Sequence, residues 1–493
     1  MELKYKANDK PNFSMLADFY EFTMANGYFM EGLAGRAAYF DMFFRRVPDG
    51  GGYAVMAGVE QLVDYLCDLR FTGGDLDYLR SKSVFSEGFL EYLSDFKFEC
   101  DVWAIPEGTP VFPYEPIVKV RGPVIQAQLI ETMLLLTINH QSLIATKTNR
   151  ICRAAEWRPV SEFGARRAQG AYGAVLGARA AYIGGCTGTS CVMTDRDYGI
   201  PAAGTMAHSW VQSFDTELEA FEAYARLYPS RCIFLVDTYN VVKSGVPNAI
   251  KASREQLLPV GCRPVAIRID SGDLTYLSKI SRKMLDDAGF NDCKILVSNS
   301  LDEHLIRGLI SQGAPIDMFG VGEKLITSQS EPVFGGVYKL SGVERADGSV
   351  EPKLKLSENV EKITTPGNKN VVRFYNRSDD KAIADVLTLN GEIIDENKPY
   401  TLFDPENTWK RKTVTDFYVR QLLTPVIKRG ERAYSPPPLN EVRDYCRDQV
   451  NHLWEEVLRF ENPQKYYVDL SQDLWDLKYG ILRDLSGGRS DRV

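Results

Sequence analysis

One repeated pattern in the middle of this chain limits the folds that it can adopt. Short apolar or small-residue runs end in polar or glycine-rich residues, at PVSEFGARR, AAYIGGCTGTS, AAGTMAHSW, CIFLVDTYN, PVAIRIDSGD, KILVSNSLDE and IDMFGVGEKL. Amphipathic segments such as DTELEAFEAYARLYP and TYLSKISRKMLDDAG lie between several of these runs. A period of roughly 20 to 30 residues is what successive βα units need. The α/β pattern therefore predicts an irregular β/α barrel of about seven strands.

The regions on either side of this pattern predict further domains, since 493 residues are too many for one core. Before it, a helix pattern (ADFYEFTMANGYFMEG) precedes strand-like runs (VWAIPEGTPVFPYEPIVKVRGP) and a long helix (AQLIETMLLLTINHQSLIATKTNRICRAAE). After it come strand patterns (NVVRFYNRSDDKAIADVLTLNGEII) and a Pro-marked helix start (SPPPLNEVRDYC). We predict an N-terminal α/β domain over residues 1–140, the barrel over 141–345 and a C-terminal accessory domain over 346–493.

Charge and cysteine usage exclude several classes of protein. The net charge of −8 disfavours nucleic-acid binding, so an anionic substrate needs basic groups gathered in one pocket. The nine scattered cysteines lack zinc-site spacing and fit free thiols in a reducing compartment. The polar N-terminus lacks the apolar core of a signal peptide, and the longest apolar stretch, LIETMLLLTI, is too short to span a bilayer. We expect a cytoplasmic protein without a membrane partner.

Polar side chains gather where the predicted strands end, which is where barrels carry function. These residues are Glu162, Arg166, Arg167, His208, Asp237, Arg268, Asp270, Ser298, Asn299 and Gly322. Guanidinium groups suit bidentate binding of carboxylates and phosphates, although each arginine alone also fits a surface salt bridge. Gly320 and Gly322 in FGVGEKL fit either a backbone phosphate-binding loop or a tight turn. Lys147, on the helix that enters the barrel, adds another basic group.

The acidic residues and the histidine have more than one interpretation. Asp270 and Asp273 in RIDSGDL are candidates for ribose hydroxyls, for a hydrated Mg²⁺ ion, or for helix caps. His208 in GTMAHSW fits a general base, a phosphoryl acceptor or a core histidine. Its place among the other strand-end polar groups favours a chemical role.

These motifs together resemble nicotinate phosphoribosyltransferases. The resemblance rests on ADFYEFTMANGYF, EFGARRAQG, GTMAHSW, LVDTYN, IRIDSGDL, VSNSLDE, FGVGEKL and GGVYKL, with KLSENVEKITTPGNK and ENPQKYYVDLS, and covers residues 16–482. It implies a type II phosphoribosyltransferase that joins nicotinate to phosphoribosyl pyrophosphate with Mg²⁺, giving nicotinate mononucleotide and pyrophosphate in NAD salvage. It also implies coupling to ATP hydrolysis through phosphorylation of His208.

The resemblance assigns roles to further residues. Thr205 and Arg268 match residues that hold nicotinate, and Tyr20 matches an aromatic residue that stacks on its ring from the second subunit. A homodimer with the site at the subunit interface follows. The expected substrate-binding residues are Tyr20, Thr205, Arg268, Asp270, Arg166, Arg167, Gly320, Gly322, Ser298 and Asn299, with His208 as the catalytic, modified residue and no assigned metal ligand.

Three positions depart from the family pattern, and several alternative functions stay open. Glu323 stands where threonine is frequent, Asn240 where LVDTYD has aspartate, and Cys191 where asparagine is common. The alternatives are transfer to nicotinamide or quinolinate, a β/α-barrel lyase or aldolase with Lys147 or Lys324 as Schiff base, and a non-catalytic nucleotide-binding protein.

Overall fold

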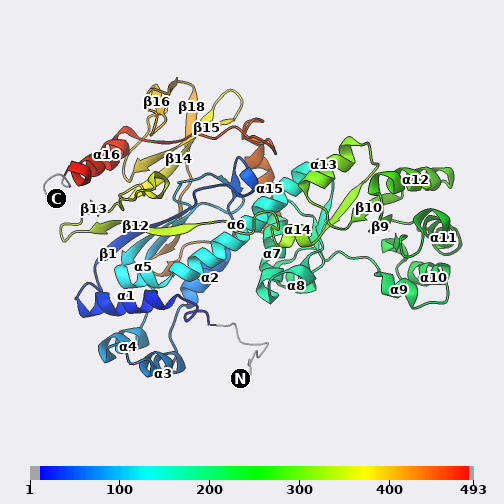
Figure 1. Ribbon diagram of the computed structural model, residues 1–493, viewed down its shortest axis with the longest axis horizontal. Coiled ribbons are helices and arrows are strands. Elements are labelled where there is room, and N and C mark those ends of the chain that lie inside the picture. Colours follow the sequence, from blue (N-terminus) through cyan, green and yellow to red (C-terminus); the bar gives the residue numbers. More distant parts are fainter. Residues whose placement is uncertain (1–11, 488–493) are drawn as a thin grey trace. The chain divides into compact units, whose positions relative to one another are not determined.

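The computed structural model describes residues 12–487 and divides into two compact units (Figure 1). The first unit contains the described residues up to 142, residues 334–438 and the described residues from 448 on; the second contains Leu143–Val333 and Leu439–Arg447. The first boundary between the two units, between Ser142 and Leu143, falls within the long helix α6 (Glu131–Ala154). The three domains drawn from the sequence, over 1–140, 141–345 and 346–493, stay a prediction.

The second unit is built on a six-stranded sheet in the order β7-β6-β11-β10-β9-β8, with every neighbouring pair parallel. Its strands are β6 (Val160–Glu162), β7 (Gly188–Thr189), β8 (Ile233–Leu235), β9 (Ala266–Ile269), β10 (Lys294–Ser298) and β11 (Met318–Val321). Among the described strands, edge strands β7 and β8 do not pair with each other. The structure thus confirms a parallel α/β sheet with six strands, and closure into a barrel is not seen.

Two of the seven predicted strand runs are largely wrong. AAYIGG forms the end of α7 (Ala171–Gly184), and only Gly188–Thr189 beyond it is extended. AAGTMAHSW contains a single bridge from Ala202 to Thr189 and then α9 (His208–Gln212). The physical reason is composition: alanine favours helix, and alanine and glycine are both depleted in strands. His208 therefore begins a short helix and does not end a strand.

The remaining helices of this unit begin as their sequences predict. Thr216 and Glu219 form a reciprocal capping box at the start of α10 (Glu217–Leu227). Asp273 accepts a hydrogen bond from the Tyr276 amide at the start of α12 (Leu274–Asp287), so it has the cap role expected as one alternative. Figure 1 shows α12 beside β9 and β10. The other helices are α8 (Val192–Tyr198), α11 (Val246–Ala252), α13 (Glu303–Ser311) and α14 (Glu323–Ile326).

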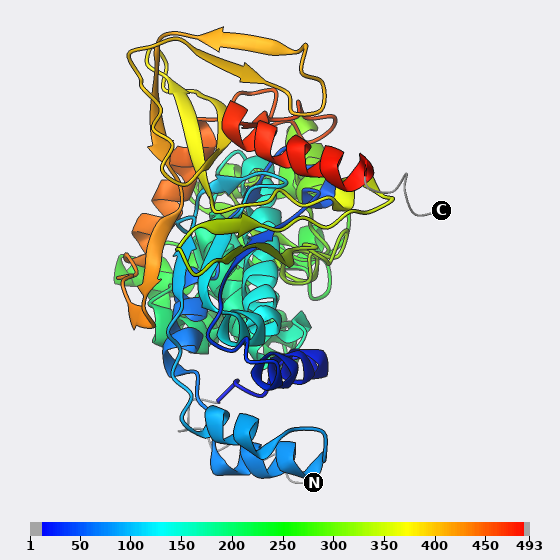
Figure 2. The same ribbon diagram turned by 90° about the vertical axis from the view of Figure 1, so that its left-hand side faces the viewer.

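The first unit holds a seven-stranded sheet in the order β13-β12-β1-β5-β3-β19-β20 and a four-stranded sheet in the order β18-β14-β15-β21. The seven strands are β1 (Ala37–Phe43), β3 (Asp101–Ala104), β5 (Val118–Pro123), β12 (Val337–Glu344), β13 (Val350–Pro352), β19 (Thr424–Lys428) and β20 (Glu431–Arg432). The other four are β14 (Lys369–Asn376), β15 (Ala382–Leu389), β18 (Phe417–Gln421) and β21 (Val468–Leu470). Figure 2 shows α16 (Gln472–Gly487, red) against the yellow strands that include β15.

Helices outside the parallel-sheet region confirm most of the sequence expectations, and two of them contain residues of both units. The ADFYEFTMANGYFMEG pattern forms α1 (Phe19–Met30), and SPPPLNEV leads into α15 (Leu439–Asn451). The long helix predicted over residues 127–156 begins earlier and is broken at Ile130 into α5 (Val124–Leu129) and α6 (Glu131–Ala154). Within residues 12–487 no helix is both long and apolar enough to cross a membrane. All nine cysteines are free thiols.

Candidate active site

Arg268 near the end of β9 gathers several of the predicted residues around one guanidinium group. Its Nη1 lies 2.8 Å from Thr205 Oγ1, its Nε 2.9 Å from Ser298 Oγ and its Nη2 2.8 Å from Asp270 Oδ1. Ser298 also donates a hydrogen bond to Asp270 Oδ1. The side chain of Arg268 is only 15% exposed, so this fork of donors is held in one orientation. Four predicted residues therefore form one network.

Asp270 is held ionised by that network. Burial alone would raise the pKa of its carboxyl group, but the hydrogen bond from Ser298 and the charge of Arg268 outweigh burial and lower the pKa. The carboxylate therefore stays negative over the physiological pH range. Its other oxygen, Oδ2, lies 3.9 Å from His208 Nε2, which links the arginine network to the histidine.

His208 is presented at the first position of α9 with its side chain 42% exposed. Its Nδ1 lies 3.2 Å from Thr238 Oγ1, and its Nε2 lies 3.9 Å from Asp237 Oδ1. The indole of Trp210 donates to the Ala220 carbonyl oxygen at 3.0 Å and so anchors this short helix. The histidine is thus a half-exposed group between a hydroxyl and two carboxylates, which contradicts the core-histidine interpretation.

Asp237 follows β8 and has two different carboxylate oxygens. Its Oδ2 accepts hydrogen bonds from the Asp270 amide at 2.9 Å and from Ser271 Oγ at 2.7 Å. Its Oδ1 is buried and has no hydrogen-bond partner among the described residues. The side chain is 1% exposed, so a negative charge is fixed on the side of the imidazole away from Thr238.

The turn after β6 packs tightly against the end of β11. Gly320, predicted in a phosphate-binding loop after this strand, lies within β11, and only Gly322 follows the strand. A side-chain carbon added to Gly164 would lie 2.7 Å from the Gly322 carbonyl oxygen, and one added to Gly320 would lie 2.6 Å from the ring of Phe163. The Arg268 guanidinium lies over that same Phe163 ring, 5.7 Å from its centre. Glycine at positions 164 and 320 therefore leaves room for the close contact between the turn and β11, and Phe163 connects this contact to Arg268.

The remaining predicted residues lie more openly. Arg166 and Arg167 are exposed in the 3-10 turn Ala165–Arg167, and Arg167 Nε lies 3.5 Å from Glu323 Oε2. Asn299 is exposed with a φ of 87°, a strained backbone conformation for a residue other than glycine. Nothing described ties its side chain to the network.

Of the departures from the family pattern, the Asn240 side chain has a structural role, whereas Cys191 is bonded through its backbone. Asn240 caps the turn Val241–Gly245, because its Oδ1 accepts from the Val242 and Lys243 amides. Cys191 precedes α8, and its amide donates to Thr189 Oγ1 at 3.0 Å. Asparagine serves such a cap as well as aspartate does.

Lys147 and Lys324 are paired with carboxylates. The Nζ of Lys147 lies 2.9 Å from Glu303 Oε1 and 2.8 Å from Ser330 Oγ, and the lysine and glutamate side chains are 3% and 0% exposed. Lys324 Nζ lies 2.6 Å from Asp302 Oδ2. Both amines are therefore engaged as ammonium donors, a state unsuited to attack on a carbonyl.

Tyr20 lies on α1 in the first unit, with 44% of its surface exposed. Other large apolar residues on or beside this helix are exposed as well: Leu16, Phe19, Met24, Met30 and Leu33. A run of exposed apolar residues of this kind is typical of an interaction surface.

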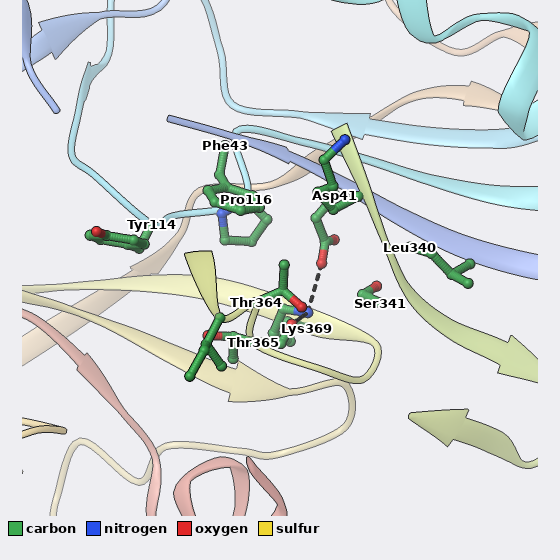
Figure 3. Close-up of a pocket in the computed structure, with 11 residues that line it drawn as sticks. Asp41, Phe43, Tyr114, Pro116, Leu340, Ser341, Thr364, Thr365 and Lys369 are labelled. Atoms are coloured by element: carbon green, nitrogen blue, oxygen red, sulfur yellow. Dashed lines mark hydrogen bonds and ion pairs between the residues drawn. The ribbon is translucent and has the colours of Figure 1, made fainter. Parts of the chain in front are cut away.

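A pocket in the first unit is lined by none of the predicted site residues. Figure 3 shows the buried ion pair between Asp41 and Lys369 in it, with Thr364 and Thr365 nearby. The pair joins β1 to the start of β14, and Lys369 also donates to the Thr365 and Gly367 carbonyl oxygens. The ion pair and the two carbonyl contacts of Lys369 indicate a structural role for this pair, while Asp41 Oδ1 and Thr364 Oγ1 have no hydrogen-bond partner among the described residues.

Sequence reasoning missed Phe163, Thr189 and Thr238, and gave Asp237 and Glu162 no role beyond their place at strand ends. Phe163 follows β6 directly, and Thr238 lies three residues beyond the end of β8. Their proximity to the carboxyl ends of strands was the available signal. Across residues 12–487, no three His, Cys, Asp or Glu side chains are grouped to hold a metal ion.

Comparison with known proteins identifies the class. Residues 15–139 match the nicotinate phosphoribosyltransferase N-terminal domain, residues 159–344 the nicotinate phosphoribosyltransferase family, and residues 368–478 the C-terminal domain of the same enzymes. Nicotinate phosphoribosyltransferase of Bacillus subtilis (strain 168) is 43% identical over 478 residues, which are 97% of this chain and 96% of that protein. The chain belongs to the nicotinate phosphoribosyltransferase family.

Solved structures agree with this assignment. The crystal structure of human nicotinic acid phosphoribosyltransferase matches with a TM-score of 0.83 and 30% identity, over 94% of this chain and 99% of that chain. The crystal structure of nicotinate-nucleotide pyrophosphorylase from Pyrococcus furiosus matches with a TM-score of 0.70 and 25% identity, over 92% and 99%. The mixed α/β fold with N- and C-terminal domains is therefore that of the family.

Proposed function

We propose that this protein transfers the phosphoribosyl group of phosphoribosyl pyrophosphate to nicotinate, giving nicotinate mononucleotide and pyrophosphate in NAD salvage. The observation that carries the proposal is the Arg268 guanidinium, fixed by Thr205, Ser298 and Asp270 at the end of β9. In a chain of this family, a fixed, partly buried guanidinium is the group that suits the carboxylate of nicotinate.

Arg268 and Phe163 together define an acceptor site. The aromatic ring offers a flat face for a pyridine ring, and the guanidinium above its edge binds the carboxylate. Nicotinamide lacks that charge. Losing one partner of a desolvated charge pair costs on the order of 2–5 kcal/mol, so the arrangement favours the acid over the amide.

The phosphoribosyl donor needs groups that bind phosphate. Arg166 and Arg167 on the turn, with the backbone around Gly320 and Gly322 at the end of β11, supply them where these two segments pack together. Mg²⁺ takes one or two carboxylates besides phosphate oxygens, and Asp270, whose carboxylate stays ionised, is suited to be one of them. The ion would neutralise charge on the departing pyrophosphate. The protein residues hold the pyridine nitrogen in line with the ribose carbon.

His208 is the residue through which ATP acts. Carboxylates face Nε2, which favours the tautomer with its proton there and leaves the lone pair on Nδ1. Nδ1 attacks the γ-phosphorus of ATP, the bond to ADP breaks, and later hydrolysis of phosphohistidine returns the free imidazole. The phosphoryl group adds about −1.5 to −2 charges beside Arg268 and so reorganises the substrate contacts.

The active form is a homodimer in which Tyr20 of one subunit completes the site of the other. The exposed apolar residues along α1 support this assembly. We further assign the open six-stranded sheet to the irregular barrel of this family, and the place of action to the cytoplasm.

The test of this function is product formation with three acceptors. Purified protein is mixed with phosphoribosyl pyrophosphate, Mg²⁺ and labelled nicotinate, nicotinamide or quinolinate. The proposal expects nicotinate mononucleotide and pyrophosphate in equal amounts from nicotinate alone. Quinolinate is included because a nicotinate-nucleotide pyrophosphorylase shares the fold. Product from nicotinamide or quinolinate in place of nicotinate contradicts it.

A lyase or aldolase is the competing function from another class. It requires a free amine, and the buried ion pair between Lys147 and Glu303 argues against Lys147 as the nucleophile. Borohydride reduction in the presence of carbonyl compounds is expected to leave Lys147 and Lys324 unlabelled. Labelling of either lysine would support the competing class.

A further inference from the structure

We propose that Glu162 and Thr189 are positioning residues for the phosphoribosyl transfer, and that the hydrogen bond between them fixes two substrate-binding segments at once. One segment is the turn that carries Phe163, Arg166 and Arg167; the other leads to Thr205. This inference rests on the proposed function.

Glu162 is a fully buried carboxylate at the end of β6. Its Oε1 accepts a hydrogen bond from the Gly164 amide, and its Oε2 accepts one from Thr189 Oγ1 at 2.7 Å. The two strands pair in register at these residues, so both side chains lie on the same face of the sheet. Burial raises the pKa of Glu162, and both hydrogen bonds oppose that rise by stabilising the ionised form.

On one side, Glu162 determines where the arginine turn begins. The Gly164 amide is bound to the carboxylate, and the Gly164 carbonyl oxygen accepts from the Arg167 amide at 2.7 Å. The Phe163 amide donates to the Val321 carbonyl oxygen at 2.8 Å. Gly164 already packs too closely on Gly322 to admit a side chain. A small displacement of the turn therefore pushes Gly164 against the backbone of Gly322.

On the other side, Thr189 holds the segment that ends in the acceptor contact. Its amide donates to the Pro201 carbonyl oxygen at 3.1 Å, and its carbonyl oxygen accepts from the Ala203 amide at 2.8 Å. Thr205, two residues further on, lies 2.8 Å from Arg268 Nη1. The Glu162–Thr189 hydrogen bond therefore joins the turn to the residue that holds Arg268.

The donors and acceptors of these hydrogen bonds explain why a glutamate is needed at position 162 and a threonine at position 189. Thr189 Oγ1 accepts from the Cys191 amide at 3.0 Å, so its own hydroxyl proton is free to go to Glu162 Oε2. A carboxylate accepts at both oxygens and satisfies both donors. Glutamine would turn an N–H group toward one of them. Valine at position 189 would leave the buried Glu162 Oε2 and the part-buried Cys191 amide without these partners.

The test compares Thr189→Val, Thr189→Ser, Glu162→Gln and the control Thr194→Val, assayed with nicotinate, phosphoribosyl pyrophosphate and Mg²⁺. Thr194 is a fully buried threonine of the same unit whose hydroxyl makes only a long 3.5 Å contact to the Val175 carbonyl oxygen. Losing a hydrogen bond to a charged group corresponds to a change of roughly tenfold or more. For Thr189→Val and Glu162→Gln we expect KM for phosphoribosyl pyrophosphate to rise at least about tenfold.

The split between KM and kcat separates positioning from general damage. We expect kcat to change much less than KM, Thr189→Ser to restore wild-type values because it keeps the hydroxyl, and Thr194→Val to behave as wild type. The inference is overturned if Thr189→Val keeps the wild-type KM, if Thr189→Ser is equally impaired, or if Thr194→Val shows the same rise. A wild-type protein that forms no product from nicotinate overturns the proposed function itself, and this inference with it.

Discussion

Asp237 directs a buried carboxylate oxygen at the imidazole of His208, 3.9 Å from Nε2, and no described hydrogen bond occupies that oxygen. The other oxygen, Oδ2, accepts hydrogen bonds from the Asp270 amide and from Ser271 Oγ, directly after β9. These bonds keep the carboxylate from rotating away from the imidazole. Such an arrangement orients a histidine and stabilises positive charge on it.

Asp237→Asn tests the contact between Asp237 and His208. Asp237→Asn keeps an oxygen for the Asp270 amide but removes the charge that faces His208. We expect the stimulation of transfer by ATP to fall at least about tenfold, because the fixed charge that orients the imidazole is lost, while transfer without ATP persists. Steady-state rates with and without ATP measure this. Asp317→Asn at the opposite end of the same sheet is the control and is expected to keep the ATP effect.

Arg268→Lys tests acceptor recognition. Lysine keeps the positive charge but loses the planar fork that Thr205, Ser298 and Asp270 hold. We expect the ratio of kcat/KM for nicotinate over nicotinamide to fall at least about tenfold, which is about 1.4 kcal/mol. Arg282→Lys, on α12 and bonded to the Phe290 and Cys293 carbonyl oxygens, should leave the ratio intact. An unchanged ratio in Arg268→Lys would mean that another group recognises the carboxylate.

A shared site predicts complementation between two defective subunits. Tyr20→Ala should bind nicotinate weakly, and His208→Ala should lose the ATP effect. After subunit exchange, a mixed dimer has one site with the native His208 of one chain and the native Tyr20 of the other. ATP-stimulated transfer at low nicotinate should therefore reappear in the mixture. If mixing restores nothing although exchange is verified, both residues serve a site within one chain.

Glu21 predicts a pH dependence of stability. Burial raises its pKa from the ordinary 4.5 to about 7, and nearby Glu131 adds to the rise, although Thr132 donates two opposing hydrogen bonds. Because the folded state disfavours the charged form, the stabilising contribution is complete below pH 4.5 and is lost as pH rises through about 7. Wild type should lose unfolding free energy relative to Glu21→Gln between those values. Burial also raises the pKa of Asp469 to about 7, but this group is present in both proteins and cancels in the comparison. The same pH dependence of the unfolding free energy in both proteins would refute the assignment.

Much of the fold was predictable because strong local signals agreed with the tertiary context. The runs CIFLV, VAIRI, KILVS and MFGV form strands, and capping residues start α10 and α12 where predicted. AAYIGG and AAGTMAHSW were misread because a count of apolar or small residues does not separate a helix from a strand when alanine and glycine dominate. The grouping of N- and C-terminal stretches into one unit depends on long-range strand pairing, such as β1 with β12, which no local pattern encodes.

The candidate site was predictable as a set of residue types but not as a geometry. Arg268, Asp270 and Ser298 converge as expected from strand ends that meet at one edge of a sheet, whereas Thr205 reaches them from a segment outside any strand. The roles of Phe163 and Thr189 depend on which strands are neighbours. The strand order β7-β6-β11-β10-β9-β8 cannot be inferred from the spacing of the motifs along the sequence. The sequence shows that Glu323 departs from the family pattern. Its contact with Arg167 depends on the position of α14 beside the turn, which the sequence does not reveal.

The most direct test of the account is the effect of ATP on nicotinate mononucleotide formation in wild type and in His208→Ala, with phosphoribosyl pyrophosphate and Mg²⁺ present. We predict that ATP stimulates transfer by wild type and that phosphate from γ-labelled ATP appears on His208. His208→Ala should keep basal transfer, with neither stimulation by ATP nor labelling. Equal stimulation of His208→Ala by ATP, or no product from nicotinate in wild type, would contradict it.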